Sequence, residues 1–132
     1  MLAGGGRYLL IQMGAAKQLA VFDLNQAQLV QTMPLLSDKV KIAAGAETFI
    51  VIEPDQHIIE RWSLTTFERE KVSQTPYTGY LKAVGMGYAS EGPFLVHYAR
   101  DADRGASTDC LLVDLETLTP VPDLQFRQRI RF

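Results

Sequence analysis

The sequence predicts an all-β protein that repeats one small antiparallel sheet along its length. Residues 48–75 carry this prediction, because they hold three short runs of strand-forming residues separated by two turns. A five-residue signature also recurs once in each third of the chain. Amphipathic helical spacing is weak throughout, and over residues 24–36 Pro34 and the repeat favour strand. Together these observations favour repeated sheets over a helical or mixed fold.

Three strands are expected before residue 40, each an apolar run that ends at turn residues. Gly14 lies in the first turn and Asn25 in the second. Pro34 closes the third strand, because proline has no backbone N–H to donate to a ladder. The expected strands cover residues 7–12, 17–24 and 27–33.

The middle of the chain is expected to hold a complete four-stranded meander. Its first strand is rich in small residues, among them Ala43, Ala44 and Gly45, and its last strand is polar. Pro54 lies in the turn between the second and third strands. The expected strands cover residues 40–45, 48–52, 57–64 and 67–73.

The last third repeats this plan with a longer loop. Its first strand again contains small residues, such as Ala83 and Gly85, and a polar loop covers residues 99–107. Pro120 interrupts the brief fourth strand, and residues 126–132 alternate apolar and basic side chains as a half-buried strand does. The expected strands cover residues 81–87, 93–98, 108–115, 118–121 and 126–132.

The recurring signature is a large apolar residue, Asp or Ser, Leu, a polar residue, and then Gln or Thr. Its copies are Phe22-Asp23-Leu24-Asn25-Gln26, Trp62-Ser63-Leu64-Thr65-Thr66 and Val113-Asp114-Leu115-Glu116-Thr117. The signature leucines are 40 and 51 residues apart, and most of the excess lies in the loop over residues 99–107. A period near 40 residues with about four short strands per unit is typical of a β-propeller blade.

The chain repeats a pattern of an apolar run, an Asp-Leu-x-Thr turn and a polar strand. Over nearly its whole length it resembles the WD-repeat and quinoprotein-like propeller superfamily. The resemblance implies a partial β-propeller of about three four-stranded antiparallel blades in one repeat domain, residues 1–132. The small-residue strands suit the crowded axis, and the polar strands suit the rim. Gly-His and Trp-Asp pairs of strict WD repeats are absent, so the looser bacterial propellers are the better match. The implied blade units cover residues 1–39, 40–80 and 81–125, with 126–132 as an extra strand.

The repeat starts with an offset of one strand, and three blades cannot close a ring. Propellers have at least about four blades, so both flanks would leave bare sheet edges and apolar faces. We therefore expect a protein partner that completes the propeller. It is either another copy, giving a homo-oligomer, or the missing blades of a longer chain.

Composition and charge exclude some functions. The chain of 132 residues is 47% hydrophobic with a formal net charge of −2, which argues against nucleic-acid binding. Its one basic cluster, Arg127, Arg129 and Arg131, is expected to form a solvated strand face, with a phosphate or acidic partner as the alternative. Apolar runs are much shorter than the roughly 20 residues of a membrane helix, so no membrane contact is expected.

The single cysteine and the N-terminal residues bear on the compartment. Cys110 excludes an internal disulfide and is expected to be a buried, inert thiol. The first residues lack the basic and apolar regions of a secretion signal. These features favour a cytoplasmic location, although the compartment remains open.

Residues 101–109 form the only candidate metal site. Asp101 and Asp103 alternate as in calcium-binding loops, but Gly105 stands where a third carboxylate is needed and Arg104 adds a positive charge. A solvated turn is therefore the preferred interpretation and calcium binding the alternative.

No catalytic or cofactor-binding residue is assigned. His57 and His97 lie in different blade units without a convergent partner. The serines lack the sequence context of a nucleophile; they are Ser63, Ser73, Ser90 and Ser107. Residues 4–6, all glycine, are expected to form a flexible turn rather than a phosphate loop. The aromatic residues Trp62, Phe22 and Phe94 are expected to pack between blades.

The sequence thus favours a structural or protein-interaction propeller, which needs no cofactor and leans away from an enzyme. The alternative is part of a propeller enzyme or ligand-binding domain of the quinoprotein or lactonase kind. Such sites draw residues from several blades, so three blades alone need not show one. A third possibility is a sugar- or calcium-binding module, supported only by the acidic loop.

Overall fold

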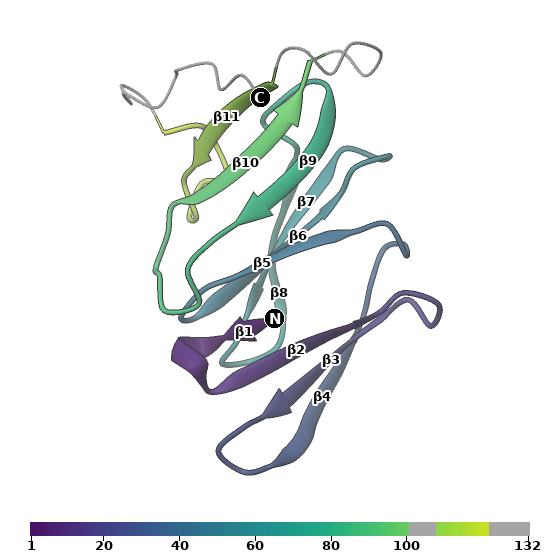
Figure 1. Ribbon diagram of the computed structural model, residues 1–132, viewed down its shortest axis with the longest axis vertical. Coiled ribbons are helices and arrows are strands. Elements are labelled where there is room, and N and C mark those ends of the chain that lie inside the picture. Colours follow the sequence, from purple (N-terminus) through teal and green to yellow (C-terminus); the bar gives the residue numbers. More distant parts are fainter. Residues whose placement is uncertain (101–107, 122–132) are drawn as a thin grey trace.

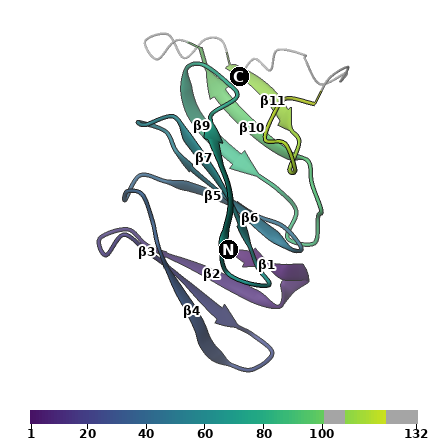
Figure 2. The same ribbon diagram turned by 180° about the vertical axis from the view of Figure 1, so that it is seen from behind.

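A computed structural model describes residues 1–100 and 108–121. These residues form three antiparallel sheets stacked face to face along the long axis of the molecule (Figures 1 and 2). The predicted all-β architecture of repeated antiparallel sheets is confirmed. Within the described ranges, no helix reaches the length and apolarity that a bilayer span requires.

Each sheet is built from strands that are consecutive in the chain. Sheet one has the order β1 (Leu2–Ala3), β2 (Tyr8–Met13), β3 (Gln18–Asp23), β4 (Gln28–Pro34), with the 3-10 turn η1 (Gly4–Gly6) between β1 and β2. Sheet two has the order β5 (Lys41–Ala44), β6 (Thr48–Glu53), β7 (Ile58–Ser63), β8 (Arg69–Gln74). Sheet three has the order β11 (Thr108–Val113), β10 (Phe94–Ala99), β9 (Tyr80–Gly85).

Most strands begin and end within two residues of the predicted bounds, and three differences have a structural reason. A two-residue β1 precedes the triglycine turn and pairs with β2. β8 begins at Arg69 rather than at residue 67, because Phe67 has a φ of 58° and belongs to the preceding turn. In place of the expected strand at 118–121 there is a single bridge between Val113 and Pro120, so sheet three has three strands in the described part of the chain. The expected strand at 126–132 lies outside the described residues.

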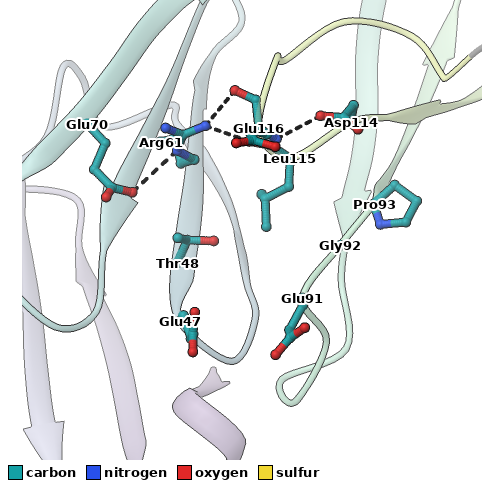
Figure 3. Close-up of a pocket in the computed structure, with 10 residues that line it drawn as sticks. All are labelled: Glu47, Thr48, Arg61, Glu70, Glu91, Gly92, Pro93, Asp114, Leu115 and Glu116. Carbon is teal, nitrogen blue, oxygen red and sulfur yellow. Dashed lines mark hydrogen bonds and ion pairs between the residues drawn. The ribbon is translucent and has the colours of Figure 1, made fainter.

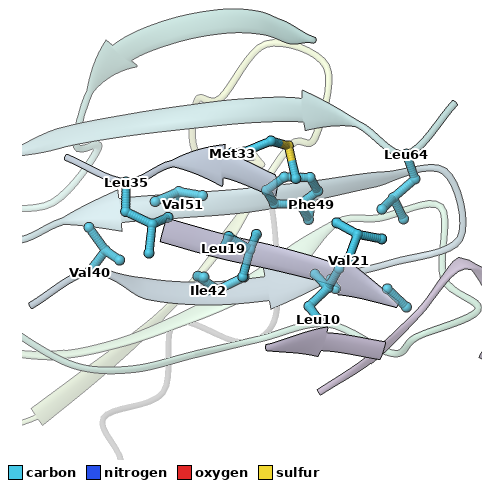
Figure 4. Packing of buried hydrophobic residues seen from close by; sticks show 12 residues of the cluster. Leu10, Leu19, Val21, Met33, Leu35, Val40, Ile42, Phe49, Val51 and Leu64 are labelled. Atoms are coloured by element: carbon cyan, nitrogen blue, oxygen red, sulfur yellow. The ribbon is translucent and has the colours of Figure 1, made fainter. Parts of the chain in front are cut away.

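Two apolar cores hold the stack together, one at each junction between neighbouring sheets. Alternation along β6 serves both: Phe49 and Val51 join the core shared with sheet one, while Ile50 and Ile52 join the core shared with sheet three. This explains why the run is apolar without interruption, since both of its faces are buried. Figure 4 shows the first core, which is composed of Ala3, Leu10, Leu19, Val21, Met33, Leu35, Val40, Ile42, Ala44, Phe49, Val51 and Leu64.

The turns that follow the first strand of each sheet meet at one end of the stack. The Gly4 N–H donates to the Gly45 carbonyl at 2.8 Å, and the Ala46 N–H donates to the Ser90 carbonyl at 2.8 Å. A third bond of 2.8 Å runs from the Gly5 N–H to the Tyr88 carbonyl. Main-chain bonds therefore tie sheets one, two and three directly to one another, which fixes their relative positions.

Candidate functional site

The recurring signature builds the same turn in all three sheets. The second signature residue, Asp23, Ser63 or Asp114, accepts hydrogen bonds from the backbone N–H groups two and three residues later, at 2.9 to 3.1 Å. The residue four positions later adopts a left-handed conformation, with φ of 54° to 59°. Asp and Ser have short side chains with an acceptor oxygen that suits this contact. The signature is therefore a structural device and carries no reaction chemistry.

Both aspartates of these turns, Asp23 and Asp114, have lowered pKa values, which favours their ionised form. Burial opposes ionisation of Asp23, but the N–H groups of Gln26 and Asn25 and the Arg7 guanidinium outweigh it, so its pKa is lowered. The Arg7 Nη2 atom lies 3.1 Å from the Asp23 Oδ2 atom. The pKa of Asp114 is lowered chiefly by the backbone N–H of Thr117.

The first candidate interaction surface is the side of sheet one that faces away from sheet two, called here the outer face. Four apolar side chains cross it in one row, because the register places Leu2 opposite Leu9, Leu9 opposite Phe22, and Phe22 opposite Leu29. Ile11, two residues after Leu9, lies on the same face and is 41% exposed. The described residues place no sheet against this row.

The matching row in sheet two is covered. Its register pairs Ala44 with Phe49 and Phe49 with Trp62, and these side chains pack against sheet one. The Phe49 and Trp62 rings stack with centroids 6.0 Å apart. The outer face of sheet one thus repeats a pattern that is buried one sheet further along.

The second candidate surface is an acidic groove of about 450 Å³ between sheets two and three (Figure 3). Arg61 crosses it: its Nη1 atom donates to the carbonyl oxygens of Leu115 at 2.9 Å and Glu116 at 2.6 Å, and its Nε atom to Glu70 Oε1 at 3.3 Å. Five carboxylates line the groove: Glu47, Glu70, Glu91, Asp114 and Glu116. The groove is negative overall, and its one cation ties the two sheets together.

The predicted candidate residues are not brought together. His57 lies in the exposed β6–β7 turn with a φ of 57°, while His97 lies in β10 opposite Cys110. Within residues 1–100 and 108–121, no group of three or more histidine, cysteine or acidic residues is arranged to hold a metal ion. The loop at 101–107 and the three C-terminal arginines lie outside the described residues.

Other predicted residues have structural positions. Ser63 caps a signature turn, and the Ser90 Oγ atom accepts from the Gly92 N–H at 3.0 Å. Trp62 and Phe94 pack between sheets, as expected. Phe22 does not, because it lies half-buried on the outer face of sheet one.

Sequence reasoning missed Arg61, although a signal was available. Arg61 stands two residues before the second signature residue of its unit, where the other two copies have Val21 and Leu112. A charged residue at an otherwise aliphatic position indicates a polar contact across the junction.

Comparison with known proteins supports the fold. No protein-family model matches the chain, and no curated protein sequence matches it. Among solved structures, it is similar to Kuenenia stuttgartiensis Hydrazine Synthase (TM-score 0.65, 10% identity, covering 99% of this chain and 34% of that one). It is also similar to the Cps50 (Swd1) β-propeller domain of Myceliophteria thermophila, with a TM-score of 0.62 and 11% identity over 99% of this chain and 37% of that one. The RRP9 WD40 repeats match with a TM-score of 0.58 and 10% identity over 99% of this chain and 34% of that one.

These likenesses define the class of fold. The three stacked sheets have the fold of consecutive β-propeller blades. The chain spans about a third of the length of each of these structures. Identities of 10–11% show the fold alone.

Proposed function

We propose that the chain is a segment of a β-propeller that serves as a protein-interaction scaffold, completed by a further blade on the outer face of sheet one. One observation carries the proposal: the first three residues of the row, Leu2, Leu9 and Phe22, occupy the positions at which sheet two packs against sheet one. An open apolar row across all four strands is typical of an interface.

The internal repeat indicates which kind of partner should cover the outer face of sheet one. Sheet two is covered by aliphatic side chains of sheet one, among them Leu10, Leu19 and Val21. The fitting partner is accordingly a four-stranded blade that presents such an aliphatic face. It belongs either to a second copy of this chain or to a longer chain that includes it.

Solution mass and one charge substitution test the proposal. Ile11→Arg should abolish association with the added blade or copy, because an unpaired charge would be buried at the contact. Val72→Arg is the matched control, since Val72 is 48% exposed and lies on β8 of sheet two. Both variants should fold, because each side chain is exposed on the surface of its sheet. Sedimentation velocity measures whether the chain associates with a second copy or with the added blade. A stable monomer in dilute solution that binds no hydrophobic dye would contradict the proposal.

The enzyme alternative rests on the likeness to Hydrazine Synthase, which extends to the fold alone. A site of this kind would need side chains contributed by blades other than these three. Clustered histidines or carboxylates at the mouth of the completed ring would favour it.

A further inference from the structure

The molecule has a second open flank, on the side of sheet three that faces away from sheet two, called here the free face. Phe94 and Val96 of β10 are buried in the core shared with sheet two. Because side chains alternate along a strand, Leu95 points to the free face, where the register places it between Gly85 and Leu112. This face lies at the opposite end of the stack from the outer face of sheet one (Figure 1). The described residues place no sheet against it.

Both open flanks are free of charged side chains along their rows. A second row on the free face places His97 opposite Ala83 and Cys110. Neither this row nor the row through Leu95 contains Asp, Glu, Lys or Arg. The row across the outer face of sheet one is also entirely apolar. Contact between the two flanks would therefore bury none of the charges that make an interface costly.

The free face of sheet three repeats the face that sheet one presents to sheet two. Leu112 and Val21 each stand two residues before the second signature residue of their unit. Their strand partners in the register are Leu95 and Leu10. Leu10 is 3% exposed and Val21 is 0% exposed, because both lie in the core between sheets one and two, whereas Leu95 is 39% exposed. The same pattern is thus buried in sheet one and open in sheet three.

The two open flanks are the two sides of one kind of junction. Between sheets one and two, Leu10 and Val21 share a core with Phe49. The free face of sheet three repeats the side of this junction that carries Leu10, and the outer face of sheet one repeats the side that carries Phe49. Leu10 and Val21 lie on β2 and β3, whose equivalents β10 and β11 are both described. A second copy can therefore supply the missing side at each flank.

The number of sheets limits how many copies such an assembly can hold. Propellers typically have about 4–8 blades. Two copies supply six sheets, which lies within this range, whereas three copies supply nine. Head-to-tail contacts generate a closed ring when the rotation between neighbours completes a circle. A ring built from this chain alone accordingly holds two copies.

We propose that the outer face of sheet one is covered by sheet three of a second copy of this chain, so that two copies form a closed ring of six blades. The ring has two identical junctions, each between the free face of one copy and the outer face of the other. This inference rests on the proposed function, because it uses the same outer face, and it names the partner and the surface that the partner contributes.

The mass of the assembly is the first test. Sedimentation velocity and native mass spectrometry of the 132-residue chain should give, at saturating concentration, twice the chain mass of 14.7 kDa. A saturating mass of three or more copies would overturn the six-bladed ring. A monomer at every concentration would overturn both the ring and association of this chain with itself.

Charge substitutions on the free face separate this inference from the proposed function. Leu95→Arg and Ala83→Arg, both at exposed positions of sheet three, should raise the dissociation constant by about a hundredfold or more. Ile11→Arg should do the same from the outer face, and Val72→Arg remains the control. If Ile11→Arg abolishes association while both substitutions in sheet three leave it unchanged, the ring is wrong and the proposed function stands. Circular dichroism confirms that each variant is folded.

Mixing two defective variants gives the sharpest test of the head-to-tail arrangement. Neither Ile11→Arg nor Leu95→Arg should associate alone, yet their mixture should form a one-to-one complex. In that complex the intact sheet three of the Ile11→Arg variant meets the intact sheet one of the Leu95→Arg variant, which leaves one sound junction. Copies joined through identical faces could not be rescued in this way. Absence of the mixed complex, both with Leu95→Arg and with Ala83→Arg in its place, would overturn the inference.

Discussion

At the scale of single residues, the chain relies on short polar side chains that satisfy turn amides. Asp23 is nearly fully buried and accepts from two backbone N–H groups and from Arg7. Asp114 makes the same backbone contacts at a more exposed position. Because Asp23 and Asp114 share this geometry but differ in burial, comparing them measures how much the turn hydrogen bonds contribute to the free energy of unfolding.

Asp23→Ala should lower the free energy of unfolding by about 1–3 kcal/mol, because it leaves two turn amides and a guanidinium without their acceptor. Asp23→Asn should cost less, since an amide oxygen still accepts from the turn. Asp114→Ala should also cost less, because water can replace the lost oxygen. Urea unfolding measures all three, and equal losses at both sites would contradict the role of burial.

The lowered pKa values make stability depend on pH. A carboxyl with a folded-state pKa below its ordinary 3.8 holds its charge more strongly in the folded protein than in the unfolded chain. Its contribution is complete above about pH 5 and is lost as the pH falls through the folded-state pKa. Asp23→Asn with Asp114→Asn should therefore flatten the acid limb of the urea midpoint plotted against pH. Asp55→Asn, an exposed carboxyl, controls for net charge.

At the scale of the element, neighbouring sheets are joined by polar ties as well as apolar cores. Arg61 of β7 reaches the signature turn of sheet three and donates to two of its carbonyl oxygens. Its repeat equivalents Val21 and Leu112 are aliphatic, so this tie belongs to one junction only. The junction between sheets two and three should depend on it.

Arg61→Met should destabilise the protein by about 1.5–3 kcal/mol, the range for hydrogen bonds to charged groups, because it keeps the stem but loses the donors. Lys39→Met is the control: the Lys39–Asp55 ion pair is 67% and 65% exposed and should contribute about 0–1 kcal/mol. Hydrogen exchange should show faster opening of sheet three in Arg61→Met. If hydrogen-exchange protection fell equally in all three sheets, Arg61 would not act at the junction between sheets two and three.

The sequence predicted the periodic features of the fold and missed the contacts between units. Alternation and the signature located most strands, because those patterns arise within one sheet. The 3-10 turn at Gly4–Gly6 and the contact of Arg61 with the signature turn of sheet three depend on neighbours distant in sequence.

At the scale of the whole molecule, the meeting of the three turns sets how closely the sheets converge. Gly45 lies at this point: a Cβ atom there would lie 2.5 Å from the Ser90 carbonyl oxygen and 2.9 Å from the Met86 sulfur. Convergence thus requires a residue without a side chain at this position. The last prediction concerns this requirement.

Gly45→Ala should destabilise the chain by about 1–3 kcal/mol, because backbone cannot yield to the added methyl group without separating the turns. Gly85→Ala is the matched control, since a Cβ atom there meets nothing within 4 Å, and the change should be neutral or stabilise by up to about 1 kcal/mol. Thermal unfolding gives the stability, and hydrogen exchange of the Gly4, Gly5 and Ala46 amides reports whether the turns separate. If those amides stay protected in Gly45→Ala while stability falls, the loss arises elsewhere and the three turns do not set the convergence of the blades.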